Sequence, residues 1–329
     1  MRIFSGIQPT GGKHLGNYIG AIRQYVEGQD RGDPAIYCVV DLHATTVAYD
    51  PAELRSYVLD TAAMLLAAGI DPQRCIFFRQ GDVQEHPELC WLLCSVTAHG
   101  DLNRMHQFKD KSAKQRELIS AGLFLYPVLQ AADILAYDAD EVPVGEDQRQ
   151  HVELARDIAE RFNQRFGETL VVPAVRVPEV GARIMDLQEP DRKMSTTAPS
   201  PAGTILVLDD EKTIVTKVKR AVTDTGREVV RGPDKAGITN LIDILSVIRG
   251  VAPDQVEADF DGRGYGDFKS AVGEEVAAYL APVRERYAEL RTDEAELERT
   301  LVAGADKARE IAAGTLARVR AAMGVGPAS

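Results

Sequence analysis

Short apolar runs rich in β-branched and aromatic residues alternate with helical patterns through the first third of this chain. The runs at 2–5, 34–40 and 75–78 are typical of strands, and the middle one is apolar almost throughout, as expected of a strand buried on both faces. Strands that alternate with helices build parallel sheets with right-handed crossovers. The predicted fold class is therefore α/β, with a doubly wound, Rossmann-like parallel sheet.

The clearest helix start lies at residue 50. Asp50 is a suitable N-cap, Pro51 suits the first helical position, and Glu53 stands where a capping box places its acidic residue. Periodic apolar patterns predict further helices at 87–96, 114–137, 146–166 and 293–323, and short apolar runs predict further strands at 170–177 and 204–208.

The chain has 329 residues, of which 45% are apolar and 27% charged, and its formal net charge is −12. This length favours two or three domains. The most apolar stretch, 57–70, contains Asp60 and is shorter than the roughly 18 residues that a membrane span needs. The N-terminus lacks the pattern of a secretory signal, so we expect a cytoplasmic protein with no membrane contact. Acidic charge disfavours indiscriminate nucleic-acid binding but allows a specific contact through a basic patch.

The four cysteines lie at positions 38, 75, 90 and 94, and no two have C-x-x-C spacing. Cys90 and Cys94 would share one face of a helix. In apolar surroundings such as these, we expect buried thiols rather than a metal or redox site.

A glycine-rich loop, residues 6–16, joins the first strand to a helix. Free N–H groups and the helix dipole at such a junction favour an anion, for instance a nucleotide phosphate. The loop is not a Walker loop, because Ile7 and His14 stand where that motif needs glycine and Ser or Thr. The glycines alone are equally compatible with a simple tight turn. An imidazole at His14, a glycine at 16 and the amide of Asn17 favour the anion site.

A proline-rich stretch, 188–203, is expected to be a mobile loop and the main domain boundary. It contains Lys193-Met194-Ser195-Thr196-Thr197. A lysine in such a loop is ordinarily solvated surface. Together with His14-Leu15-Gly16-Asn17, however, this segment resembles the KMSKS and HIGH signatures of class I aminoacyl-tRNA synthetases. Thr196 replaces the second lysine of the KMSKS signature.

The resemblance narrows to the tryptophanyl-tRNA synthetases and covers essentially the whole chain. It is carried by the stretches 4–9, 40–43, 107–111, 126–135, 142–151 and 180–185.

Asp133 is a carboxylate on an otherwise apolar helical segment and would be costly to bury without a partner. From the residues alone, a bond to a neighbouring backbone N–H or basic side chain explains it. The resemblance implies that Asp133 accepts the indole N–H of tryptophan. An acceptor-only carboxylate suits an indole, which has one donor and no acceptor.

The resemblance implies the remaining site residues as well. The tryptophan site would contain Phe4, Gly6, Val40, His43, Tyr126, Gln130, Asp133, Ile134, Val142, Val144 and Gln148, with Tyr126 and Gln148 holding the ammonium. The ATP site would contain Gln8, Pro9, Thr10, His14, Gly16, Asn17, Gly145, Asp147, Gln148, Ile184, Lys193, Met194 and Ser195. The catalytic set would be Gln8, Lys111, Lys193 and Ser195, with no metal held by the protein itself.

The reaction implied is activation of L-tryptophan by ATP with Mg²⁺, followed by transfer of the acyl group to the 3′ end of tRNA(Trp). Catalysis is then mainly positioning and charge stabilisation, in agreement with the absence of a Ser-His-Asp or Cys-His set. The basic segment comprises Arg104, His106, Lys109, Lys111, Lys114 and Arg116, and would serve pyrophosphate and the tRNA acceptor stem. No long editing insertion is visible.

The resemblance also implies a homodimer and a domain order. It assigns 1–104 to a Rossmann-like catalytic half, 105–170 to a helical insertion with the dimer interface, 171–190 to the return to the sheet, 191–290 to a helical anticodon-binding region, and 291–329 to a C-terminal helix packing back on the catalytic domain.

One residue departs from the family pattern, because Gln130 stands where the family usually has methionine against the indole. The amide needs partners in an apolar slot, so we expect a pocket with altered tightness or analogue tolerance. Other readings stay open: a tyrosyl-tRNA synthetase, a catalytically weakened paralogue that binds nucleotide or a protein partner, and a general nucleotidylyltransferase. A lone Asp133 suits a phenol hydroxyl poorly, and a nucleotidylyltransferase would not need the helical last third.

Overall fold

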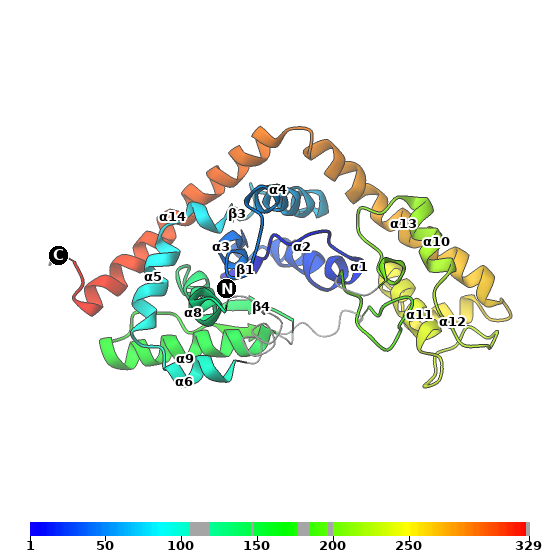
Figure 1. Ribbon diagram of the computed structural model, residues 1–329, viewed down its shortest axis with the longest axis horizontal. Helices are drawn as coiled ribbons and strands as arrows, with labels where there is room; N and C mark the ends of the chain where they lie inside the picture. Colours follow the sequence, from blue (N-terminus) through cyan, green and yellow to red (C-terminus); the bar gives the residue numbers. More distant parts are fainter. Residues whose placement is uncertain (106–118, 146–147, 177–183, 197–199, 327–329) are drawn as a thin grey trace. The chain divides into compact units, whose positions relative to one another are not determined.

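The computed structural model describes residues 1–105, 119–145, 148–176, 184–196 and 200–326 (Figure 1). Its internal contacts divide the chain into two compact units. Unit 1 comprises Met1–Thr10, Tyr25–Pro178 and Asp293–Ser329, and unit 2 comprises Gly11–Gln24 and Glu179–Thr292. The five-part domain order given above stays a prediction.

A parallel sheet of five strands, counted over the described residues, forms the centre of unit 1, in the order β3-β2-β1-β4-β5. Its strands are β1 Ile3–Ile7, β2 Ala35–Val39, β3 Ile76–Arg79, β4 Glu141–Pro143 and β5 Ala174–Arg176. All five residues of β2 are buried, as its unbroken apolar run predicts. The parallel α/β fold class is confirmed.

The strand order reverses beside β1. The chain adds β2 and β3 on one side of β1 and then β4 and β5 on the other. In doubly wound sheets, ligands bind outside the carboxyl ends of the strands at such a reversal. The site of unit 1 is therefore expected between the ends of β1 and β4.

Helices surround this sheet in unit 1 (Figure 1). They are α2 Arg23–Asp30, α3 Asp41–Ala44, α4 Pro51–Ala68, η2 Gln80–Asp82, α5 Glu85–Cys94, α6 His99–Arg104, α8 Ala121–Leu135, α9 Arg149–Phe166 and α14 Glu294–Met323. Helix α4 begins as predicted, because Asp50 Oδ1 accepts the backbone N–H groups of Ala52 and Glu53 at 2.8 and 2.9 Å. Helix α8 packs against both α5 and α9.

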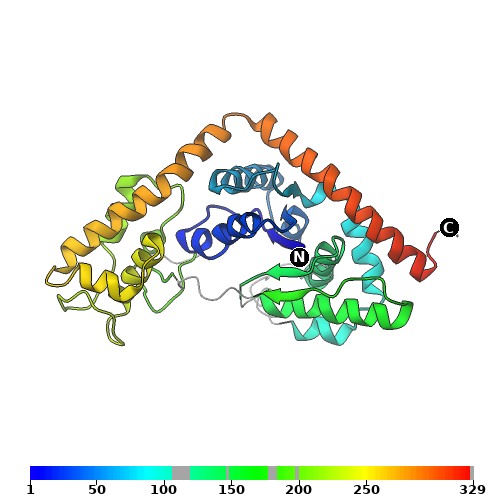
Figure 2. The same cartoon turned by 180° about the vertical axis from the view of Figure 1, so that it is seen from behind.

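The long C-terminal helix α14 lies along β3 and α5, with the C-terminus at its far end (Figure 2). The close approach depends on Gly304, since a Cβ there would lie 1.8 Å from the carbonyl oxygen of Phe77. Asp293 caps the helix through the N–H of Glu296, and Glu298 pairs with Arg79. The helix predicted at 293–323 is confirmed.

The described part of unit 2 is helical apart from its loops. Its elements are α1 Leu15–Asn17, η1 Tyr18–Ile22, η4 Pro201–Gly203, α10 Glu211–Lys219, α11 Ala236–Arg249, α12 Pro253–Asp259 and α13 Tyr265–Leu290. Helices α10 and α11 both pack against α13.

The strand predicted at 204–208 is wrong. Leu206 forms only a single antiparallel bridge to His14, so this stretch joins the unit 2 core without a sheet partner. The strand predicted at 170–177 shortens to β5, and the helix predicted at 87–96 is shifted towards the N-terminus as α5. The first part of the helix predicted at 114–137 lies outside the described residues.

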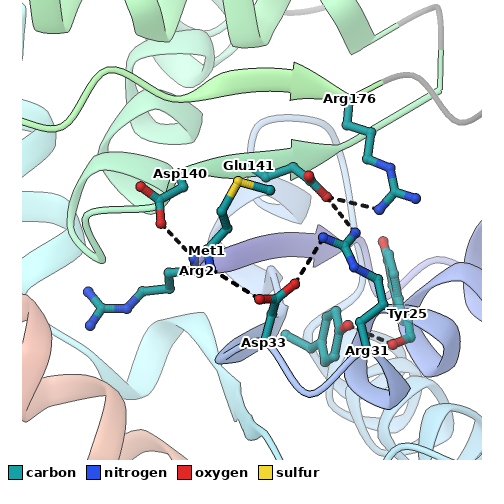
Figure 3. A network of polar contacts seen from close by, with 9 residues as sticks. Met1, Arg2, Tyr25, Arg31, Asp33, Asp140, Glu141 and Arg176 are labelled. Carbon is teal, nitrogen blue, oxygen red and sulfur yellow. Dashed lines mark hydrogen bonds and ion pairs between the residues drawn. The ribbon is translucent and has the colours of Figure 1, made fainter.

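A network of ion pairs lies beside the starts of β1 and β4, away from the carboxyl ends of these strands (Figure 3). Oε1 of Glu141, at the start of β4, accepts from Arg31 at 3.0 Å and Arg176 at 2.9 Å. Arg31 also pairs with Asp33, which holds the N-terminal amine of Met1 at 3.1 Å. The network joins the N-terminus before β1, the start of β4 and the end of β5 to the loop before β2.

Among the described residues, no single helix is both long and apolar enough to cross a membrane, although α11 and α12, bent by 104°, reach the length and composition criteria as a pair. The same part of the chain contains no group of three or more His, Cys, Asp or Glu side chains placed to hold a metal ion. All four cysteines are free thiols.

Candidate active site

Asp133 lies on α8 with 1% of its surface exposed, and three donors surround its carboxylate. Oδ1 accepts from Nε2 of Gln80 at 2.7 Å and from Nδ1 of His86 at 2.6 Å. Oδ2 accepts from Nε2 of His43 at 2.7 Å. The carboxylate therefore has side-chain partners, which is what a charge buried at this depth requires.

The donors are themselves held in place. The Oε1 atom of Gln80 accepts the backbone N–H of Leu42 at 3.1 Å, so its amide nitrogen faces Asp133. Nε2 of His86 lies 2.5 Å from the Tyr137 hydroxyl, which leaves Nδ1 to donate to the carboxylate. Each of the two donors on Oδ1 is thus oriented by a second contact.

These contacts keep Asp133 ionised. Burial alone would raise the pKa of this carboxyl, but hydrogen bonds from His43 and His86, with their electrostatic attraction, outweigh burial and hold the pKa well below its usual value. A carboxylate has about four acceptor positions. Two donors occupy Oδ1 and one occupies Oδ2, so Oδ2 keeps an acceptor position on the oxygen shared with His43.

Of the other predicted tryptophan residues of unit 1, His43 bonds the carboxylate, and Phe4 and Tyr126 contact rings of this network. Phe4 stacks on Tyr137 with ring centroids 5.4 Å apart, and His43 meets Tyr126 edge-on at 6.1 Å. The Tyr126 hydroxyl contacts Nε2 of His151 at 2.9 Å. Val40, Ile134 and Val142 are buried, Gln130, Val144 and Gln148 are half-buried, and Gly6 is exposed.

Gly6 closes the end of β1 tightly against Val40. A Cβ at position 6 would lie 2.9 Å from Cγ1 of Val40. A side chain there would displace a predicted pocket residue, so the close approach requires glycine. The remaining unit 1 candidates, Gln8, Pro9, Thr10 and Gly145, lie after the ends of β1 and β4.

In unit 2, His14 and Asn17 form a reciprocal cap at the start of α1. Nδ1 of His14 accepts the backbone N–H of Asn17 at 3.2 Å, and Oδ1 of Asn17 accepts the backbone N–H of His14 at 3.2 Å. A neutral imidazole that accepts at Nδ1 carries its proton on Nε2. The cap therefore presents an N–H donor at a helix N-terminus, where an anion is favoured.

Burial, together with the charges of Lys193 and Lys13, lowers the pKa of His14 to about 4. His14 is therefore neutral at pH 7. Gly16 lies against the imidazole, because a Cβ at 16 would lie 3.1 Å from the ring. Burial also lowers the pKa of Lys13, to about 8. Lys13 and Lys193 place two cations beside the imidazole.

The predicted signature loop is anchored by its second residue, Met194. Met194 is buried, and its N–H donates to the carbonyl of Ile184 at 3.1 Å. Lys193 is exposed, and its backbone forms an isolated antiparallel β-bridge with Met185. The carbonyl of Ser195 accepts the hydroxyl of Thr204 at 2.8 Å. Burial of Met194 thus fixes the loop and leaves Lys193 at the surface.

Two predicted residues, Lys111 and Asp147, lie outside the described residues. So does most of the basic segment, His106 to Arg116; its first member, Arg104, is exposed and pairs with Asp101 at 2.5 Å.

Sequence reasoning missed Gln80, His86 and Tyr137 around Asp133, and Lys13 beside His14. His86 and Gln80 are 47 and 53 residues from Asp133 in the chain, so no local spacing connects them. The sequence offered one signal: His86 and Gln80 border apolar segments. Polar residues in such positions need buried partners.

Residues 1–281 match the family described as tRNA synthetases class I (W and Y). The parallel Rossmann-like sheet, the His14 cap and the loop that carries Lys193 agree with this class. The chain belongs to this family. It is 51% identical over 331 residues to a protein of Streptomyces avermitilis named tryptophan–tRNA ligase 2, covering 99% of this chain and 98% of that one. It is 52% identical over 326 residues to a tryptophan–tRNA ligase of Leifsonia xyli subsp. xyli, covering 98% and 96%.

The fold also matches a solved structure described as tryptophanyl-tRNA synthetase from Campylobacter jejuni complexed with ADP and tryptophan. The two are 38% identical with a TM-score of 0.86, covering 99% of this chain and 100% of that one.

Proposed function

We propose that this chain activates L-tryptophan with ATP, giving tryptophanyl-adenylate and pyrophosphate, and then transfers tryptophan to the 3′ end of tRNA(Trp). The arrangement around Asp133 supports tryptophan most directly. A buried, ionised carboxylate with an acceptor position left on Oδ2 suits the single N–H donor of an indole. A substrate without that N–H would leave a buried acceptor unpaired, which is strongly disfavoured.

In this proposal the substrate is its own nucleophile. The tryptophan carboxylate attacks the α-phosphorus of ATP, a P–O bond forms, and the bond to pyrophosphate breaks. ATP enters with Mg²⁺ as the bound substrate. The protein orients the reactants and stabilises charge on the leaving pyrophosphate through the His14 N–H, Lys193 and Lys111.

Gln8, Ser195 and the ATP residues named above complete the proposed nucleotide site. We further propose a homodimer through residues 105–170 and a cytoplasmic location, where ATP and tRNA are available. Light scattering of the purified chain at micromolar concentration tests the dimer.

The activity is tested by ATP–pyrophosphate exchange with tryptophan, with tyrosine and with neither. Exchange that depends on tryptophan alone is expected. Equal exchange with tyrosine would instead favour a tyrosine enzyme, and no exchange with either would favour a paralogue that has lost catalysis together with the second lysine of its loop.

A further inference from the structure

The donors on Oδ1 of Asp133 come from outside the residues proposed to touch tryptophan. Gln80 belongs to η2 and His86 to α5, whereas His43, on Oδ2, belongs to the tryptophan residues. His86 and Gln80 are fully buried. Donors on Oδ1 therefore engage the oxygen that is turned away from His43.

We propose that His86, oriented by Tyr137, is a positioning residue for tryptophan selection, because its N–H fixes Asp133 so that the acceptor position left on Oδ2 meets the indole N–H. This inference rests on the proposed function. His86 touches neither the indole nor the reacting atoms in this assignment. It acts through Asp133.

Tyr137, His86 and Asp133 form a chain of hydrogen bonds. The Tyr137 hydroxyl lies 2.5 Å from Nε2 of His86, and Nδ1 of His86 lies 2.6 Å from Oδ1. Tyr137 is fully buried, stacks on Phe4 and meets the His86 ring at 5.4 Å. These ring contacts leave the imidazole little freedom to turn. The N–H of His86 therefore keeps a fixed direction towards Oδ1 of Asp133.

The loss of one donor has a distinctive consequence. Other titratable groups facing Asp133 or its donors are His43 from α3, Cys38 from β2, Cys90 and Glu85 from α5, and Tyr137 after α8. Cys38 and Tyr137 stay protonated, because burial raises the pKa of both groups. Without the His86 N–H, burial is opposed mainly by His43 and Gln80, and the carboxyl takes up a proton at higher pH than in the wild type. A protonated Asp133 no longer presents the same acceptor.

The test measures KM and kcat for tryptophan in ATP–pyrophosphate exchange at pH 7 for His86→Leu, His86→Asn and Tyr137→Phe. Asn places an N–H close to the position of Nδ1 and should rescue. We expect KM for tryptophan to rise about tenfold in His86→Leu, with kcat within about threefold of the wild type. Tyr137→Phe should show a smaller rise, about threefold, and His86→Asn none.

Leu89→Val is the matched control, because Leu89 is fully buried on the same helix and offers no donor. It should loosen α5 and leave KM for tryptophan within about twofold of the wild type. A KM for His86→Leu within about twofold of the wild type, or one that matches Leu89→Val, would overturn the proposal. If His86→Leu does not fold, an unchanged KM for Tyr137→Phe overturns it instead. Failure of the wild type to exchange with tryptophan would overturn the proposed function itself, so the two failures are distinct.

Discussion

His14 and Asn17 cap each other at the start of α1, with the two hydrogen bonds both at 3.2 Å. Asparagine at position 14 can still cap the helix, but it has no Nε2 atom. We therefore expect His14→Asn to retain wild-type stability and to lower the rate of adenylate formation at least about tenfold. His14→Ala should lose the same rate and also about 1 kcal/mol of stability. Single-turnover rates and thermal midpoints separate the two effects; a normal rate in His14→Asn would exclude phosphate contact by the imidazole.

Lys193 stands exposed beside the buried Met194, and its charge acts on His14. Lys193→Ala is expected to lower the adenylation rate at least about tenfold, since it removes a contact made mainly in the transition state. Arg192→Ala is the matched control: Arg192 is the neighbouring exposed cation and pairs with Glu189 at 2.6 Å. A single-turnover rate that is the same in both variants would refute the role of Lys193.

Gln130 lies half-buried one helical turn before Asp133, on the same face of α8. Methionine would remove a polar amide that must find partners beside an apolar substrate. For an indole inhibitor with an added ring methyl, Gln130→Met should lower the inhibition constant about threefold. Inhibition constants that agree between wild type and variant would show that Gln130 does not shape the pocket.

Glu141, at the start of β4, joins Arg31 to Arg176 (Figure 3), and its side chain is 10% exposed. Glu141→Ala leaves both guanidinium groups without this acceptor and should cost about 2 kcal/mol of stability. Glu153→Ala, at an exposed position on α9, should cost less than about 0.5 kcal/mol. Thermal midpoints of the two variants provide the comparison, and equal midpoints would contradict the ion-pair account.

The parts of the fold that the sequence predicted are those with strong local signals. The unbroken apolar run of β2 and the Asp50 cap of α4 each depend on residues adjacent in the chain. The run at 204–208 has the same local character as a strand, yet only Leu206 finds a bridge partner, in His14. Whether an apolar run becomes a strand depends on a neighbour distant in sequence, and no local pattern encodes that neighbour.

The same distinction applies to the site. Asp133 was conspicuous as a charge in an apolar helix, and His14 as an imidazole at a helix start. Gln80, His86 and Tyr137 were not, because each fills a polar requirement that only folding creates. The positions of residues that act through another residue, as His86 does through Asp133, therefore have to come from the structure.

The most direct test of the account is ATP–pyrophosphate exchange with tryptophan in Asp133→Asn. Asparagine keeps the size of the side chain but replaces one acceptor oxygen by a donor, which opposes the N–H groups of His43 and His86. Asp140→Asn is the control, since Asp140 accepts the N–H of Arg2 at 2.7 Å beyond the opposite edge of the sheet. We predict that kcat/KM for tryptophan falls at least about a hundredfold in Asp133→Asn and is unchanged in Asp140→Asn. Exchange in Asp133→Asn within about threefold of the wild type would contradict the indole readout.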